Sequence, residues 1–391
     1  MAQSVAQDVA ELQEELIAVR RDLHQHPELA FQEHRTAGII ASRLEALGVA
    51  VKRGVGGTGV VGLIEGRSPG PTVMIRVDID GLPVLETAGR PYGSREQGRM
   101  HACGHDAHTA VGLALASIFA RRRGEMKGRV KLVFQPAEEI VAGAQAMLKD
   151  GVMRDPPVDK VLSFHVWSTL PVGTVGVRPG VIFGSADEFA IVVKGRGGHG
   201  GLPHLSVDPI AVAGQLITTL QTILAREVPP AKGGVLGFGT VHGGSQFNII
   251  PDTVELTGNI RAFSEDVRAQ LLKRAEEVTA AVTRGLRADY EFRHLHGTPA
   301  IDNNPEVAAL VARVAEGVVG AKNVVQVEPT PVGDDCAYFI REAPGCYFLV
   351  GSANETRGIT APHHSPLFDV DEGALPIATR VLAEAALQYL K

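Results

Sequence analysis

TVMIRVDID, residues 72–80, is a run of apolar and β-branched residues that ends in two aspartates. Two further strand-like runs follow it, GRVKLVFQ at 128–135 and DKVLSFHV at 159–166. Helical stretches separate these runs, at about 106–122 and about 142–149. Strands that alternate with helices predict an α/β domain whose sheet is at least partly parallel.

The sequence pattern changes after residue 184. A strand, a helix, two strands and a second helix are expected there in that order, at 187–195, 209–225, 235–241, 252–263 and 265–286. This βαββα order predicts a small α+β domain in which two helices cover one sheet.

The first domain resumes after this insertion. ADYEFRH at 288–294 and GCYFLVG at 345–351 read as strands of the first domain, and the final helix is expected at 375–390. We therefore expect a larger domain and a smaller domain inserted into it, with bounds at 1–184 and 289–391 for the former and 185–288 for the latter.

Composition excludes several classes of protein. A chain of 391 residues exceeds what one hydrophobic core usually serves, which agrees with two domains. Its net charge of −6 argues against a general affinity for nucleic acid or anionic membranes. The longest apolar stretch, 109–120, is too short to span a bilayer. No secretory signal is expected, and three cysteines cannot form a disulfide framework, so a cytoplasmic location is expected.

A glycine pattern at 54–59 imitates a dinucleotide-binding fingerprint. Gly54, Gly56 and Gly59 follow the order G-x-G-x-x-G. That fingerprint requires a helix after the glycines, whereas VVGLIEG at 60–66 is rich in strand-forming residues. The glycines therefore predict a turn between two strands.

Candidate metal ligands recur near the ends of the predicted strands. HACGHDAH, residues 101–108, alone contains three imidazoles, a thiol and a carboxylate. The candidates are Asp78 and Asp80 after one strand, Glu138 and Glu139 after the next, His165 in a third, Cys103 and His105 before a helix, and His364 in a C-terminal loop. Open α/β sheets gather ligands at the carboxyl ends of their strands, so we expect these groups to converge.

The chemistry of this set favours zinc, manganese, cobalt or nickel over magnesium or calcium. More ligands are present than one tetrahedral ion needs, which indicates two divalent ions. Adjacent side chains of an extended segment point in opposite directions, so one of Glu138 and Glu139 can bind metal while the other serves as a general base. A further role for His101 and His108 stays open.

Two other classes of function remain. Cys103 could act as a nucleophile activated by a nearby histidine, in an enzyme without metal catalysis. The chain could also be a non-catalytic metal- or ligand-binding protein, although simple binding needs no spare carboxylate. A zinc finger is excluded because a second ligand pair is missing, and a base deaminase because P-C-x-x-C is absent.

Taken together, the motifs resemble the M20 family of metallopeptidases, and in particular its amidohydrolase branch. That branch includes hippurate hydrolases, N-acyl-amino-acid amidohydrolases (aminoacylases), indole-acetyl-amino-acid hydrolases and related carboxypeptidases. The matching segments are RRDLHQHPELAFQE, RVDIDGLPV, HACGHDAHTA, VFQPAEE, SFHVW, GRGGHGGLPH, FNIIPD, GNIRAF and HHSPLFDVDE, in the family's order from residue 20 to residue 372.

The resemblance implies a mixed-sheet, zinc-peptidase-like catalytic domain and assigns roles within it. It implies that the metal ligands are Cys103, His105, Glu139, His165 and His364. Glu138 matches the general base, and Asp80 would orient a histidine or tune the metals. His364 is preferred over His363 because it directly precedes Ser-Pro. Cys336 stands where an aromatic residue is common in the family.

For the insertion, the resemblance implies a ferredoxin-like lid and dimerisation domain. His199 and Asn248 would hydrogen-bond the carbonyl oxygen as negative charge develops on it, and Arg261 would hold the substrate's carboxylate. In such relatives these groups can reach the site from a neighbouring subunit, so a homodimer or homotetramer is expected.

The implied activity is a cytoplasmic, two-metal amidohydrolase. It would cleave the amide bond of an N-acyl amino acid, such as an N-acetyl or N-benzoyl derivative, to a carboxylic acid and a free amino acid. A metallo-carboxypeptidase or dipeptidase acting on short peptides is the alternative. The expected partners are small molecules, with no nucleic acid and no membrane.

Overall fold

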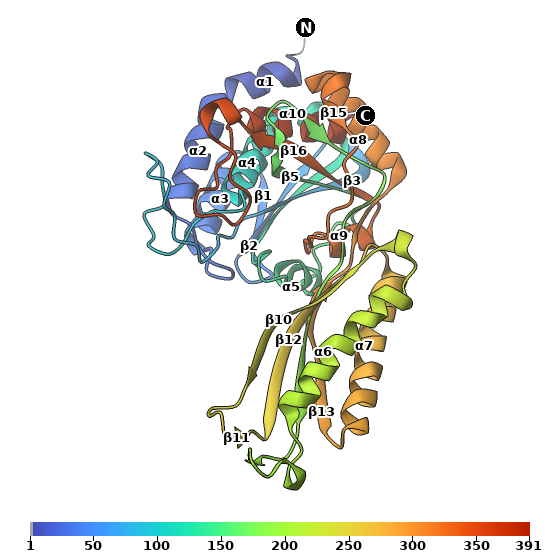
Figure 1. Ribbon diagram of the computed structural model, residues 1–391. Helices are drawn as coiled ribbons and strands as arrows, with labels where there is room; N and C mark the ends of the chain where they lie inside the picture. Colours follow the sequence, from blue (N-terminus) through green and yellow to red (C-terminus); the bar gives the residue numbers. More distant parts are fainter. Residues whose placement is uncertain (1–2) are drawn as a thin grey trace. The chain divides into compact units, whose positions relative to one another are not determined.

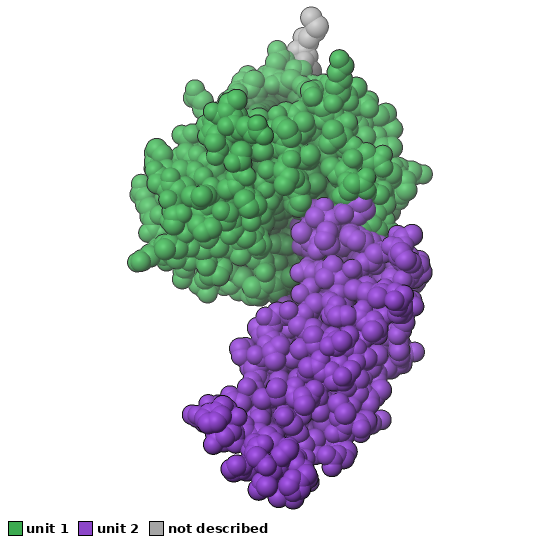
Figure 2. Space-filling model, in the orientation of Figure 1, with its two compact units in different colours: residues 1–182, 302–328, 335–391 green, residues 183–301, 329–334 purple. Residues whose placement is uncertain are grey.

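The computed structural model describes residues 3–391, which form two compact units. The larger unit comprises the chain up to Ile182 together with Asp302–Glu328 and Asp335–Lys391, and the smaller comprises Phe183–Ile301 and Pro329–Asp334 (Figure 2). Each unit has its own hydrophobic core. The smaller unit is therefore an insertion into the larger one.

The larger unit is built on an eight-stranded sheet of order β1-β2-β4-β3-β5-β16-β6-β15 (Figure 1). Its strands are β1 (Ala50–Val55), β2 (Gly59–Glu65), β3 (Ser68–Asp78), β4 (Lys127–Gln135), β5 (Lys160–Pro171), β6 (Val175–Gly176), β15 (Val324–Val325) and β16 (Gly345–Ala353). The central neighbours β4, β3, β5 and β16 run parallel, whereas β1 and β2 are antiparallel additions. The predicted α/β mixed sheet is confirmed.

The glycines at 54–59 form the expected turn, because Val55 pairs with Gly59 between antiparallel β1 and β2. No helix follows them directly; the next element after β2 is another strand, β3. The pattern is therefore a hairpin.

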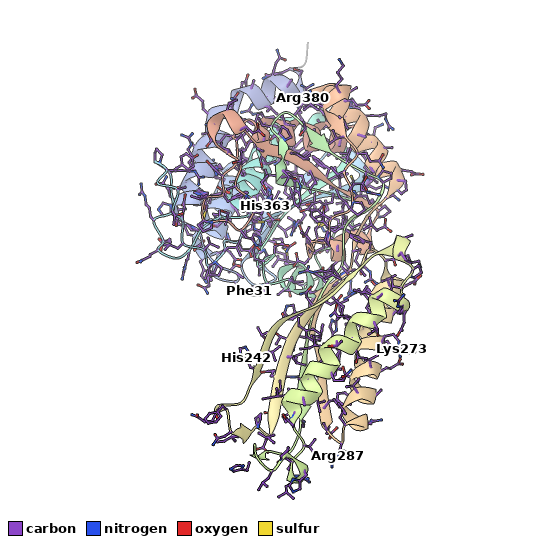
Figure 3. The ribbon with its side chains drawn as sticks, in the orientation of Figure 1. Phe31, His242, Lys273, Arg287, His363 and Arg380 are labelled. Atoms are coloured by element: carbon purple, nitrogen blue, oxygen red, sulfur yellow. The ribbon has the colours of Figure 1, made fainter. Side chains whose placement is uncertain are left out.

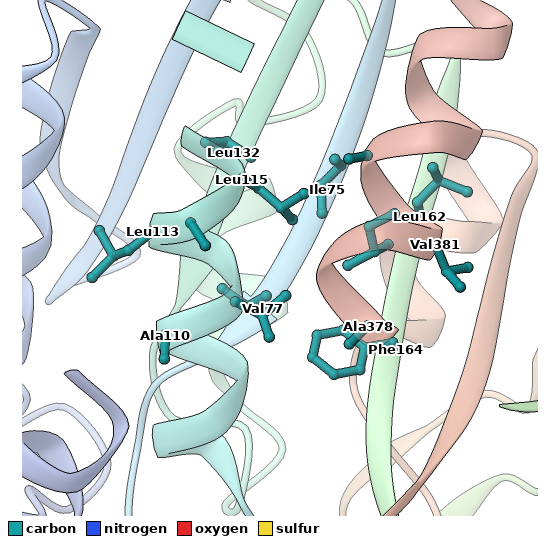
Figure 4. Close-up of a cluster of buried hydrophobic side chains, with 14 of the residues drawn as sticks. Ile75, Val77, Ala110, Leu113, Leu115, Leu132, Leu162, Phe164, Ala378 and Val381 are labelled. Carbon is teal, nitrogen blue, oxygen red and sulfur yellow. The ribbon is translucent and has the colours of Figure 1, made fainter. Parts of the chain in front are cut away.

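Helices cover the sheet and supply most of the core. They are α1 (Val5–Glu11), α2 (Gln13–Gln25), α3 (His34–Ala46), α4 (His105–Arg121), α5 (Gly143–Lys149), α8 (Pro305–Val319), α9 (Ala337–Glu342) and α10 (Ala374–Tyr389). Helix α4 is buried along nearly its whole length, and its apolar side chains meet β3, β4 and β5 (Figure 4). Burial of apolar surface stabilises the folded state by about 25 cal/mol per Å². This packing also fixes the start of α4 relative to the ends of the strands.

The smaller unit contains a four-stranded antiparallel sheet of order β10-β12-β8-β13. Its elements in chain order are β8 (Ala186–Lys194), α6 (Pro209–Arg226), β10 (Val235–Gly243), β12 (Thr253–Arg261), α7 (Glu265–Gly285) and β13 (Asp289–Thr298). The side chains of Asp208 and Ser264 cap the first turns of α6 and α7. This βαββαβ order is that of a ferredoxin-like unit, as predicted.

Shorter elements complete the two units. Two-stranded pairs are formed by β9 (Gly198–His199) with β11 (Ile249–Ile250), and by β7 (Gly180–Phe183) with β14 (Ile301–Asn303). Short 3₁₀ helices lie at Arg123–Glu125, Pro203–Leu205, Pro230–Lys232, Ala321–Asn323 and Glu355–Arg357.

The prediction that residues 288–294 form a strand of the larger domain was wrong. These residues lie in β13, which pairs with β8 of the smaller unit, so the insertion extends to Ile301 and not to 288. Alternating apolar and polar residues show that one face of a strand is buried, but they do not identify the partner strand. In residues 3–391, no helix combines the length and apolar character needed to cross a bilayer.

Candidate metal centre

The parallel strands bring the two acidic pairs together. Strand β3 ends at Asp78, whose register partner on β4 is Gln135, and Asp80 and the Glu138–Glu139 pair follow these two strand ends. Parallel neighbours present their carboxyl ends at the same sheet edge, so acidic residues from separate parts of the sequence meet there.

The CGH segment joins this edge at the start of α4. His105 is the first residue of α4, and Gly104 precedes it with a φ of 92°. A Cβ atom at Gly104 would lie 2.4 Å from Cγ2 of Val166 on β5. Glycine is therefore required for the backbone to pass this close to β5 while Cys103 and His105 lie on either side of it.

The five expected ligands and Glu138 lie in one cluster. Three overlapping groups each keep their donor atoms within 4.8 Å of one another: Cys103, His105 and His165; Cys103, Glu139 and His364; and His105, Glu138 and Glu139. The Cys103 Sγ lies 3.5 Å from Nε2 of His165, and the His364 Nε2 lies 3.5 Å from Oε2 of Glu139.

The structure distinguishes between the two adjacent C-terminal histidines. His363, labelled in Figure 3, is placed within hydrogen-bonding distance of the Val166 carbonyl through Nε2 and of the Ser168 hydroxyl through Nδ1, both at 3.0 Å. His364 has a φ of 65°, which turns its ring toward Glu139. His364 is therefore the histidine that lies against the cluster.

Asp80 contacts two members of the cluster, Glu139 and His105. Its Oδ2 accepts a hydrogen bond from the backbone N–H of Glu139 at 3.0 Å. The Nδ1 of His105 lies 2.9 Å from the Asp80 carbonyl oxygen and 3.2 Å from Oδ1. A carboxylate in this position fixes the imidazole ring and leaves Nε2 of His105 directed at the cluster.

Asp78 and His108 form a neighbouring buried pair. Oδ1 of Asp78 lies 2.5 Å from Nδ1 of His108, and Arg76 donates to its Oδ2 at 2.7 Å. The backbone N–H of Val166 donates to Nε2 of His108 at 3.0 Å. Both ring nitrogens of His108 thus have hydrogen-bond partners in the protein. His108 therefore lies beside the cluster and is not one of its expected ligands.

The electrostatics of the cluster fit bound cations. Burial, with Asp80 and Asp78 nearby, raises the pKa of Glu139 to about 7 against the opposing effect of His105. Burial and the charges of Glu139 and Glu138 raise the pKa of Cys103 well above its usual value. Nε2 of His105 and Oε1 of Glu139 are buried without a hydrogen-bond partner. Sulfur, nitrogen and oxygen donors with unsatisfied buried atoms are a fitting set for divalent zinc-like ions.

The expected lid residues lie in the smaller unit, where they fall into two places. His199 on β9 pairs with Ile249 on β11, and the Asn248 carbonyl accepts from Gly200 at 2.8 Å, so exposed His199 and Asn248 are neighbours. Arg261 ends β12, the nine-residue strand that begins just after β11. At about 3.4 Å per residue, β12 extends over roughly 27 Å from Thr253 to Arg261.

Sequence reasoning assigned no role to a buried ionic network next to the cluster. Arg20 donates to Asp106 through Nε at 2.8 Å and to Asp369 through Nη2 at 2.7 Å. Nδ1 of His24 lies 2.8 Å from the same Asp106 oxygen. Arg20 and His24 stand four and eight residues after buried Leu16, on the apolar face of α2, and that spacing is a signal that could have revealed them.

Comparisons with known proteins agree with this geometry. The model of peptidase family M20/M25/M40 matches residues 74–388. N-acetylcysteine deacetylase of Bacillus subtilis is 38% identical over 381 residues, which cover 96% of this chain and 97% of that protein. Thermostable carboxypeptidase 2 of Saccharolobus solfataricus is 37% identical over 393 residues, covering 100% and 99%.

A solved structure of similar fold is the YXEP protein of Bacillus subtilis, described as a dinuclear metal binding peptidase from the M20 family. It superposes with a TM-score of 0.83 at 35% identity and covers 97% of this chain and 99% of its own. The family match spans well over half of the sequence, and the relatives align along nearly all of it. The predicted resemblance is confirmed: this chain belongs to peptidase family M20/M25/M40 and is a hydrolase of that family.

Proposed function

We propose that this chain is a two-metal amidohydrolase that cleaves the amide bond of N-acyl amino acids. The observation that carries the proposal is that five sulfur, nitrogen and oxygen donors converge at one edge of the sheet, with a further carboxylate, Glu138, beside them. Simple metal storage would not need that additional carboxylate. The deacetylase relative, named for an N-acyl amino acid, supports the substrate class.

The proposed ligands of two divalent ions are Cys103, His105, Glu139, His165 and His364. Bound ions of this kind polarise a carbonyl group and lower the pKa of water, which is the chemistry that amide hydrolysis needs. The dinuclear relative supports a pair of ions. Zinc, manganese, cobalt and nickel all suit this donor set.

Glu138 is the proposed general base. Its Oε2 lies 4.0 Å from Nε2 of His105, so its carboxylate is at the cluster without being one of the five expected ligands. In this role Glu138 takes the proton of the attacking water and passes it to the leaving amine. Asp80 orients His105 and holds the backbone of Glu139, so it acts through those two residues.

The proposed substrate contacts come from the smaller unit. His199 and Asn248 would donate hydrogen bonds to the carbonyl oxygen as it gains negative charge, and Arg261 would bind the free carboxylate. Arg261 ends β12, whereas Asn248 lies before the strand begins, and the strand itself extends over roughly 27 Å from Thr253 to Arg261, which is longer than an N-acyl amino acid. This length favours an assembly of two or more copies, in which the two groups at one substrate come from different chains.

The alternative of a nucleophilic Cys103 has less support. A nucleophilic cysteine reacts as the thiolate and normally has a lowered pKa. Burial and nearby acidic groups instead raise the pKa of Cys103 well above its usual value. A bound cation would stabilise this thiolate, which favours a ligand role. Cleavage of short peptides remains a second candidate because a carboxypeptidase is among the relatives.

Hydrolysis assays with defined metals test the proposal. The purified chain would be stripped by chelation, reloaded with one metal at a time, and assayed on N-acetyl, N-benzoyl and indole-acetyl amino acids and on dipeptides. We expect amide cleavage only after reloading. Activity that survives complete metal removal would favour the thiol mechanism, and a metal-loaded protein inert toward the whole panel would contradict the proposed reaction.

A further inference from the structure

The segment RRDLHQHPELAFQE, residues 20–33, ends in a glutamate to which the proposed reaction gives no role. Glu33 follows the loop between α2 and α3, and its side chain is fully buried. Phe31 of the same loop is labelled in Figure 3. A buried carboxylate is costly unless its oxygens accept hydrogen bonds, so its partners indicate what it does.

Both oxygens of Glu33 have partners. Oε1 accepts from the backbone N–H of Ala137 at 2.9 Å, and Oε2 accepts from the Thr58 hydroxyl at 2.5 Å. Ala137 is the residue immediately before Glu138, the proposed base. Glu33 therefore reaches from the α2–α3 loop to the backbone that carries Glu138.

The turn that Glu33 contacts has an unusual backbone. Ala137 has a φ of 52° and Val141 a φ of 59°, both in the left-handed region that residues other than glycine rarely occupy. Such conformations cost about 1–3 kcal/mol each and persist where surrounding contacts impose them. The direction of the Glu138 side chain depends on this turn, because the turn sets its Cα–Cβ vector.

Three buried carboxylates accept from separate backbone N–H groups of this turn and of the start of α5 that follows it. Glu33 accepts from Ala137, Asp80 accepts from Glu139 at 3.0 Å, and Asp335 accepts from Ala144 at 2.9 Å. Of the three, Glu33 is bonded closest before Glu138. Its carboxylate accepts from Thr58 and Ala137, and neither of these is an expected metal ligand. Its effect on Glu138 can thus be separated from an effect on metal binding.

We propose that Glu33 is a positioning residue: its carboxylate imposes the left-handed conformation of Ala137 and so aims Glu138 at the reacting water. This inference rests on the proposed function of Glu138. Thr58 completes the arrangement, because its hydroxyl fixes the second oxygen of Glu33 and leaves the first for Ala137.

Three variants test the role. In Glu33→Ala, Ala137 loses its acceptor, and we expect kcat to fall on the order of 100-fold, the scale associated with misplacement of a catalytic group by about 1 Å. KM and bound metal should stay near the wild-type values. Glu33→Gln keeps an oxygen for Ala137 and offers its amide to Thr58, so it should restore most of kcat. Thr58→Val should give a smaller loss than Glu33→Ala.

Asp8→Ala is the matched control for lost stability. Asp8 is also a buried carboxylate, and it accepts from Nε of Arg122 at 2.6 Å, away from the turn. This variant should lower the melting temperature while leaving kcat unchanged. If Glu33→Ala loses activity only in proportion to lost folded protein or lost metal, or if Glu33→Gln is as inactive as Glu33→Ala, the positioning role is wrong.

Amide hydrogen exchange separates this inference from the proposed function. Glu33→Ala should speed exchange in the peptide that contains residues 136–143, whereas Asp8→Ala should not. If Glu33→Ala speeds exchange but the wild-type protein hydrolyses none of the substrates, the contact of Glu33 with the turn is supported and the proposed reaction is rejected. Unchanged exchange with unchanged kcat would overturn the positioning role itself.

Discussion

Two clusters of buried charged groups meet at His105 and Asp106, consecutive residues of α4. The two clusters differ in the groups that neutralise their carboxylates. Asp106 faces the guanidinium of Arg20 and the imidazole of His24, all fully buried. His105, one residue earlier, faces Glu139 and the Asp78–Asp80 segment. Within the described residues Glu139 pairs with His105 and His364 and with no guanidinium or ammonium group.

The pKa values follow from this difference. Burial alone would raise the pKa of Asp106, but Arg20 and His24 lower it well below its usual range. In the other cluster burial raises the pKa of Glu139 to about 7. Burial would lower the pKa of His105, yet Asp78 and Asp80 raise it to about 10. Around Glu139, protons or bound metal ions therefore have to supply the positive charge, whereas Asp106 has the permanent charge of Arg20 beside it.

The largest effect is expected from Glu138→Gln, which removes the spare carboxylate of the second cluster. Loss of a general base should lower kcat about 10²- to 10⁴-fold. Metal content and melting temperature should remain near wild type, since the five expected ligands are intact. Steady-state kinetics with metal analysis would measure this, and the exposed Glu316→Gln serves as a neutral control. Near-normal turnover in the metal-loaded variant would rule out Glu138 as the base.

The next effect concerns the first cluster. Arg20→Met leaves buried Asp106 with only the His24 imidazole as its partner, whereas Asp369 keeps the guanidinium of Arg90 at 2.9 Å. Breaking a buried pair such as Arg20–Asp106 costs about 3–5 kcal/mol. The free energy of unfolding from denaturant titration of the metal-free protein would show it. A loss below about 1 kcal/mol would mean that Arg20 does not neutralise a buried carboxylate in this network.

Glu139→Gln is the opposite case within the same comparison. It removes a carboxylate that has no permanent cation, so the metal-free protein should be as stable as the wild type, or more stable. Metal affinity should fall, because one donor oxygen is lost. A destabilisation of the metal-free protein as large as that of Arg20→Met would contradict the distinction between the clusters.

The raised pKa values of Glu139 and His105 predict how the stability of the metal-free protein depends on pH. Glu139, with a pKa raised from 4.5 to about 7, binds more protons in the folded metal-free state than in the unfolded state between these values. His105 does so between 6.5 and about 10. Their contribution to stability is present at low pH and is lost as pH rises through the folded-state pKa values.

Metal binding should reverse this trend, because ligands bind as deprotonated groups and release protons. The metal-loaded protein should therefore gain stability over the metal-free one as pH rises from 6 to 9. Calorimetry in buffers of different ionisation enthalpy would count the released protons. A metal affinity independent of pH would show that the second cluster does not hold the protons assigned to it.

Much of this arrangement could be predicted from the sequence, because it rests on local patterns. Alternating strands and helices predicted the parallel core. The residue types near strand ends and in the loop before a helix predicted the cluster that includes Cys103, His105 and Glu139. The pairing of β13 with β8 could not be predicted, since a strand's pattern does not name its partner.

The partners of buried charged residues could not be predicted either. Arg20 and Asp369 are 349 residues apart in the chain, and Glu33 and Ala137 are 104 apart. The spacing of Arg20 on the apolar face of α2 indicates that it is buried, but in both cases only the fold identifies the partner. The same holds for Arg261, whose distance from Asn248 depends on the direction and length of β12.

The smallest effect is expected from Arg21→Met, the neighbour of Arg20. Arg21 forms two hydrogen bonds of 2.7 Å to Glu372, but its side chain is 41% exposed. Exposed ion pairs contribute about 0–1 kcal/mol, and salt screens them. Glu372 also keeps Nη1 of Arg20 at 3.5 Å, so this substitution leaves no buried charge alone.

The double variant makes that reasoning testable. In the Arg20→Met background Glu372 depends on Arg21 alone, so adding Arg21→Met should cost more than it does in the wild type. Partners that share a network couple by about 0.5–3 kcal/mol. Denaturant titration of the four proteins gives the coupling energy directly. A purely additive result would mean that Glu372 belongs to the exposed surface, and that the first cluster ends at Asp369.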